Sequence, residues 1–181
     1  MDIELPPLLA VATVFAASMS GCQAPQAPAG DVALTDTELV ERGDYLVRIA
    51  GCNDCHTPGY MDQQGNVDKS LWLTGNRLGF HGPWGTTYPS NLRLRMIEMD
   101  EAQWLAYSAD LHTRPMMPDF AIRAMHEDDR RAIYRFARSL GAPGIPAPAY
   151  LPPGQTPPAP YLQLVLPPPD DSTSTAQPPA N

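Results

Sequence analysis

The chain has 181 residues and a formal net charge of −8 at pH 7. An acidic protein is repelled by the phosphate backbone of nucleic acids, so this charge argues against a nucleic-acid partner. It suits instead a protein partner that presents a basic docking patch.

Residues 1–21 have the pattern of an export signal. Leu5–Ala17 is mostly apolar, close to the length of a signal-peptide core and too short to span a bilayer. Met19–Cys22 resembles a bacterial lipoprotein cleavage site, because small residues directly precede the cysteine. We expect a lipidated Cys22 that tethers the exported chain to a membrane in the bacterial periplasm. An ordinary signal peptide and an uncleaved, membrane-associated N-terminus are the alternatives.

After a flexible linker over 22–33, a helix is predicted from about 35 to 50. Thr35 and Glu38 match the pattern of a capping box. Gly43 lies mid-helix, where glycine costs about 1 kcal/mol relative to alanine. A helix tolerates this where another helix passes very close, and the Ile133–Phe136 face of the last predicted helix is the natural partner.

Cys52–His56 reads Cys-x-x-Cys-His, the attachment signature of a c-type haem. The two thiols share one helical turn and can reach both vinyl groups of the porphyrin, and His56 can then donate a ring nitrogen to the iron. We therefore expect one covalent haem c on Cys52 and Cys55, with His56 as an axial ligand. A zinc site or a thioredoxin-like dithiol is the alternative, although the third cysteine, Cys22, offers no second ligand pair.

Residues 57–99 are rich in Gly, Pro and Asn, and we expect ordered loops around the haem. Helices are predicted over about 101–111, with Asp100 as N-cap, and over about 127–140. The predicted fold class is all-α, with residues 34–141 as the haem domain.

A six-coordinate electron carrier needs a second strong iron ligand. The proline-flanked loop around Met116 and Met117 is non-helical and stiff, and a thioether ligand favours ferrous iron. The remaining candidates are Met125, His81, His112 and His126.

Further side chains are candidates for contacts with the haem propionates, with ordinary core or surface roles as the alternative. They are Trp72, Trp84, Tyr88, Asn91, Arg77, Arg93 and Arg95.

The final segment, 142–181, holds 13 of the 22 prolines. Proline removes backbone donors and restricts the preceding residue, so continuous helix or sheet is not expected. Apolar residues such as Tyr150 and Leu151 favour an extended wrap on the domain, and the last dozen residues are predicted to be disordered.

Several of these segments resemble the haem domains of cytochrome subunits of membrane-associated bacterial dehydrogenases for alcohols, aldehydes and sugar acids. The matching segments, within about 40–141, are Arg42–Leu46, Cys52–Thr57, Gly85–Leu92, Asp100–Trp104, Met117–Phe120 and Met125–Leu140. The resemblance implies a class I-like cytochrome c fold in which the N- and C-terminal helices cross. It also implies that the methionine directly before the proline, Met117, is the second axial ligand.

The predicted function is single-electron transfer by a monohaem cytochrome c, between a periplasmic dehydrogenase or other donor and a respiratory acceptor. Such a protein is a carrier and not an enzyme. The alternatives are a haem-based sensor or ligand-binding protein with an open distal site, a haem enzyme such as a peroxidase, and a cytochrome subunit of a dehydrogenase complex.

Overall fold

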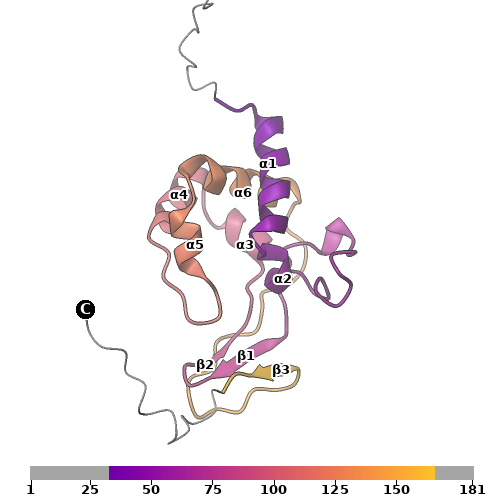
Figure 1. The fold of residues 1–181 in the computed structure, drawn as a ribbon, viewed down its shortest axis with the longest axis vertical. Coiled ribbons are helices and arrows are strands. Elements are labelled where there is room, and N and C mark those ends of the chain that lie inside the picture. Colours follow the sequence, from indigo (N-terminus) through magenta and orange to yellow (C-terminus); the bar gives the residue numbers. More distant parts are fainter. Residues whose placement is uncertain (1–32, 166–181) are drawn as a thin grey trace, which may run out of the picture. The chain divides into compact units, whose positions relative to one another are not determined.

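The computed structural model describes residues 33–165. The predicted export signal, Cys22, nearly all of the 22–33 linker and the end of the Pro-rich segment lie outside these residues. The described chain is mostly helical and contains a small sheet (Figure 1). The helices are α1 (Asp36–Ile49), α2 (Cys52–His56), the 3-10 helix η1 (Lys69–Leu71), α3 (Leu92–Ile97), α4 (Glu101–Ala109), α5 (Asp119–Ala124) and α6 (Glu127–Ser139). The strands are β1 (Gly79–Gly82), β2 (Gly85–Thr87) and β3 (Tyr161–Gln163).

The predicted helix starts are confirmed. Thr35 Oγ1 accepts a hydrogen bond from the Glu38 N–H at 3.3 Å, and the Thr35 N–H donates to Glu38 Oε2 at 2.8 Å. A second capping box, between Asp100 and Gln103, starts α4. Each box pairs backbone donors that a helix start otherwise leaves unsatisfied. Among the described helices, of which α1 is the longest, none is long and apolar enough to cross a bilayer.

Helices α1 and α6 cross at Gly43, which is buried. A Cβ built on Gly43 would lie 2.5 Å from Phe136 Cβ and 2.7 Å from the carbonyl carbon of Ala132. No side chain fits at that distance, so glycine at this position lets the two helix backbones touch. The predicted close crossing of the first and last helices is confirmed.

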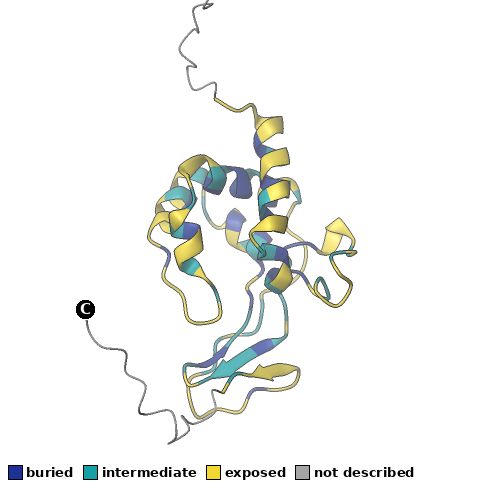
Figure 2. Cartoon of the chain, in the orientation of Figure 1, coloured by how far each residue is buried: buried dark blue, intermediate teal, exposed yellow. Residues whose placement is uncertain are grey.

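The hydrophobic core lies between these helices. Figure 2 shows buried residues on α3 and α6 and along one side of α1. Trp72 is 6% exposed and meets Phe136 edge-on, with ring centroids 6.2 Å apart. Its indole N–H donates to the Val67 carbonyl at 2.9 Å, so its one donor serves the core and not a haem propionate. The indole N–H of Trp104 likewise donates to the Arg130 carbonyl, at 2.8 Å.

A three-stranded sheet corrects the all-α prediction. Strand β1 pairs antiparallel with β2 and parallel with β3, in the order β2-β1-β3. The strands are only three or four residues long, and glycine occupies several of their positions, so they carry no alternating apolar pattern. The fold is therefore mostly helical with a small sheet.

The Pro-rich segment packs on the rest of the domain as far as residue 165. Figure 1 shows it running from the end of α6 to β3, beside β1 and β2. Leu151 exchanges two backbone hydrogen bonds with Thr86, at 2.8 and 3.0 Å. Closer to α6, Asn91 Nδ2 donates to the Pro143 carbonyl at 3.0 Å. The limits of the haem domain at 34–141 and of the extension at 142–181 stay predictions.

Candidate functional site

A cavity of about 340 Å³ brings the predicted haem residues together. Its walls come from α2, from the segment between β2 and α3, from the loop before α5, and from the Pro-rich segment. The volume lies within the range of about 300–1,000 Å³ that is typical of cofactor and ligand sites. The candidate ligands in its wall are Cys52, Cys55, His56, His112, Met116, Met117 and Met125.

The Cys-x-x-Cys-His motif forms α2. Gly51 precedes it with φ of +70°, a left-handed conformation that glycine adopts without strain. Cys52 and Cys55 lie three positions apart in the helix, so they share a face, and both are free and half-buried cysteines. Burial raises the pKa of Cys52 to about 11 and also raises that of Cys55. Both groups are therefore neutral thiols at pH 7.

His56 is buried, and a single hydrogen bond orients its ring. Its Nδ1 lies 2.7 Å from the carbonyl oxygen of Ser90. A carbonyl only accepts, so Nδ1 carries the proton and Nε2 keeps a free lone pair. Burial lowers the pKa of His56, although the bond to Ser90 opposes this shift. A neutral imidazole, oriented through one nitrogen and free at the other, is the form that binds iron.

The loop around Met117 is closed at its base by Asp119. The Thr113 N–H donates to Asp119 Oδ2 at 2.6 Å, and the Asp119 N–H donates to the Met117 carbonyl at 2.9 Å. Arg123 holds the same carboxylate, at 2.9 Å. Within this loop Met117 is half-buried, whereas Met116 is 51% exposed, so burial favours Met117 as the ligand.

The other candidate ligands are placed differently. Met125, at the end of α5, lines the cavity and packs against the core. His112 also lines the cavity, but its side chain is 71% exposed. His81 lies in β1 with Nδ1 at 2.7 Å from Thr86 Oγ1, and His126 is the N-cap of α6. Neither His81 nor His126 lines the cavity.

Two of the predicted propionate partners have buried polar atoms without a protein partner. They are the Tyr88 hydroxyl and the Trp84 indole N–H, and Tyr88 lines the cavity. A buried hydroxyl without a hydrogen bond costs about 1–3 kcal/mol, so its presence indicates a polar group that approaches the site. Tyr88 is therefore the propionate candidate with the most support.

Asn91, Arg93 and Arg95 have structural roles. Asn91 caps α3 and donates its amide to the Pro-rich segment. Arg93 is 4% exposed and donates to the carbonyl oxygens of Gly141 and Ser70, at 2.9 Å each. Arg95 forms an ion pair three residues along the chain, at 2.9 Å. The Asn91 amide and the Nε and Nη1 groups of Arg93 already donate to backbone carbonyls, so these donors are not free for a haem propionate.

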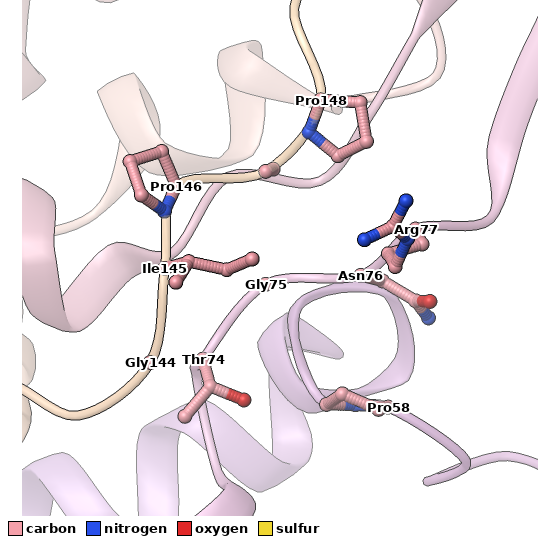
Figure 3. A pocket seen from close by; sticks show the side chains of 10 residues that line it. Pro58, Thr74, Gly75, Asn76, Arg77, Gly144, Ile145, Pro146 and Pro148 are labelled. Atoms are coloured by element: carbon pink, nitrogen blue, oxygen red, sulfur yellow. The ribbon is translucent and has the colours of Figure 1, made fainter.

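A second cavity, of about 530 Å³, lies beside the Pro-rich segment (Figure 3). Its walls are Pro58, residues 74–77 and residues 144–148. Arg77 is its one charged lining residue, and none of the predicted haem ligands lines it. Pro148 lines both cavities, so the Pro-rich segment borders each of them.

The lining of the first cavity fits a haem. Two free thiols on one helix face, a neutral imidazole nitrogen, a thioether and an unpartnered phenol are the groups that a covalent c-type haem uses. Sequence reasoning missed Ser90, whose contribution is a backbone carbonyl without any side-chain signal. It also missed Asp119, for which a carboxylate at the first position of a helix after a proline was a usable cue.

Comparisons with known proteins agree with this chemistry. No family model matches the chain, and no solved structure matches it. The chain is 31% identical over 139 residues to the cytochrome c subunit of gluconate 2-dehydrogenase from Pantoea cypripedii. The match covers 67% of this chain and 31% of that protein, so it spans about a third of the relative's length. Across about two thirds of its own length, this chain is thus similar to a cytochrome c subunit.

Proposed function

We propose that this protein is a monohaem c-type cytochrome that passes single electrons between a dehydrogenase or other donor and a respiratory acceptor. The observation that carries this proposal is the cavity into which Cys52, Cys55, His56 and Met117 all face as lining residues. The similarity to a dehydrogenase cytochrome c subunit supports the same function.

Each ligand has one task in this proposal. Cys52 and Cys55 hold the haem through two thioether bonds, and His56 and Met117 bind its iron. The haem, when bound, supplies the one-electron chemistry, and the protein adjusts its potential through ligands, burial and hydrogen bonds. The Ser90 carbonyl keeps the His56 ring in one orientation and one tautomer. No proton transfer or substrate binding is needed, so the protein is a carrier and not an enzyme.

Tyr88 has a distinct task. Its buried hydroxyl has no partner in the protein and would donate to a haem propionate, which would offset the cost of burying that charged group. A donor of this kind stabilises the ionised propionate and thereby influences the reduction potential.

The proposed location rests on the predicted export signal. We propose that the chain is exported to the periplasm and tethered through a lipid on Cys22, with redox proteins and the membrane as its partners. The name of the relative favours a second candidate role, as a cytochrome subunit of a dehydrogenase complex. Co-purification of the full chain from its native membrane separates the two roles, because a stable subunit keeps a dehydrogenase bound and a free carrier does not.

The ligand assignment is tested by absorption spectroscopy of the ferric holoprotein. Met117→Ala should abolish the near-infrared sulfur-to-iron charge-transfer band and give a high-spin spectrum. Met116→Ala and Met125→Ala are matched controls that should keep the band. A high-spin ferric spectrum in the unmodified protein, shifting on addition of cyanide, would instead support a sensor or another protein with an open distal site.

A further inference from the structure

One residue of the Pro-rich segment contacts the loop that carries Met117. Tyr150 is half-buried and lines the cavity. The Arg114 guanidinium lies over its ring, with Cζ 3.8 Å from the ring centroid. Arg114 stands three positions before Met117 in the same loop. The stacked pair therefore joins the loop to a segment that begins only after α6.

The other end of the Tyr150 side chain is also fixed. Its hydroxyl donates to the carbonyl oxygen of Trp84 at 2.8 Å. Trp84 lies in the turn between β1 and β2. The ring is thus held by the β1–β2 turn on one side while it contacts Arg114 on the other, so it connects that turn with the loop that carries Met117.

The backbone around Tyr150 is held as well. The next residue, Leu151, forms its two backbone hydrogen bonds with Thr86. At Gly85 a Cβ would lie 2.9 Å from the carbonyl carbon of Pro152, so the segment lies directly on the hairpin. These contacts limit the movement of the Tyr150 ring and make it a firm support for Arg114.

The tip of the loop has one more contact with the sheet side. Thr87 Oγ1 donates to the Pro115 carbonyl at 2.7 Å. Asp119 closes the base of the loop, whereas Thr87 and Tyr150 hold its tip. In a haem-loaded protein, a loop held at both places would keep the Met117 sulfur close to its place in the cavity, which would favour Met117 over an outside ligand at the iron.

We propose that Tyr150 is a positioning residue for Met117, so that the Pro-rich segment is a working part of the haem site. The inference rests on the proposed function. It adds that Tyr150 limits the access of outside ligands to the iron position that Met117 would occupy. Without the Tyr150 contact, Met117 would still be the ligand, but its sulfur would dissociate from the iron more often. An outside ligand then gains access.

The test is the rate at which cyanide binds to the ferric, full-length holoprotein. Tyr150→Ala removes both the stacked ring and the hydrogen bond, and should accelerate cyanide binding about tenfold. Tyr150→Phe keeps the ring and should give an intermediate rate. Tyr161→Ala is the matched control, because Tyr161 belongs to the same segment but meets His81, with ring centroids 5.9 Å apart. Its rate should equal that of the unmodified protein.

A cyanide rate in Tyr150→Ala equal to that of the unmodified protein overturns the inference. So does an equal acceleration in Tyr161→Ala, which would reflect general loosening of the segment. If Tyr150→Ala does not retain haem, Arg114→Ala is the second variant. It removes the stacking of Arg114 on the Tyr150 ring from the exposed side, and it must accelerate cyanide binding. If Met117→Ala keeps the charge-transfer band, the ligand assignment itself fails. If Met117→Ala loses that band but the Tyr150 variants bind cyanide at the rate of the unmodified protein, the ligand assignment stands and only the inference about Tyr150 fails.

Discussion

The ring nitrogen Nδ1 of His56 lies 2.7 Å from the carbonyl oxygen of Ser90. This bond joins α2 to the segment just before α3, which are 34 residues apart in the chain. The carbonyl sets the tautomer, so Nε2 is the nitrogen that remains for a metal. This is the arrangement expected of the proposed iron ligand, since the ring orientation would be set before any metal binds.

Replacing the ring of His56 should therefore leave a site that free imidazole can fill. His56→Gly keeps both thioether cysteines, and we expect a ferric protein with altered spin state and retained haem. Added imidazole should restore the low-spin absorption spectrum, because it occupies the buried space of the lost side chain. Failure of imidazole to change the spectrum, with haem still attached, would contradict the assignment of His56.

The helix crossing gives a prediction about stability. Gly43→Ala gains about 1 kcal/mol in helix propensity but forces a methyl group into Phe136 and Ala132. Overpacking of this kind costs about 1–3 kcal/mol, and rigid backbone on the opposite side places this case at the upper end. We expect a lower free energy of unfolding in denaturant titrations of the holoprotein.

The control for that variant is Glu41→Ala, on the exposed side of the same helix. It should change the free energy of unfolding by less than about 0.5 kcal/mol. A Gly43→Ala protein more stable than the unmodified one would mean that α1 and α6 do not touch at this point.

A buried arginine gives a second stability prediction. Arg93→Met keeps much of the side-chain volume but leaves the Gly141 and Ser70 carbonyls without their donors. We expect a loss of about 3 kcal/mol in the free energy of unfolding. The exposed Arg95→Met should lose less than about 1 kcal/mol, since its ion pair is on the surface.

The same pair of variants examines the role of Arg93 near the haem. Because its Nε and Nη1 groups donate to backbone carbonyls, Arg93→Met should leave the reduction potential close to that of the unmodified protein, as measured by spectroelectrochemical titration. A large shift in potential with unchanged stability would reinstate Arg93 as a propionate partner.

Local sequence signals predicted the parts of the fold that depend on neighbouring residues. The capping box of Thr35 and Glu38, and the starts of α4 and α6, follow from side chains within one helical turn, whereas α4 ends at Ala109, two residues before the predicted end. Gly43 was informative because glycine within a helix lowers its stability, and a close helix–helix contact explains why it is there. The short helices α3 and α5 were missed, since six residues cannot display a helical period.

What the sequence could not reveal depends on distant contacts. Strand β3 pairs with β1 from far along the chain, and short glycine-bearing strands carry no pattern of their own. Tyr150 read only as an apolar residue of a proline-rich tail, because its contacts with Arg114 and Trp84 exist only after folding. The candidate ligands, in contrast, were proposed from residue type and spacing, with Met117 chosen by the family resemblance, and they stay predictions.

The central claim is that one haem is attached covalently through Cys52 and Cys55. Its most direct test is the mass of the intact, denatured protein after expression in cells that mature c-type cytochromes. We predict a mass increased by one haem in the unmodified protein, and no haem in the Cys52→Ala/Cys55→Ala double variant. An unmodified protein that releases its haem on denaturation, or that carries none, would contradict the claim.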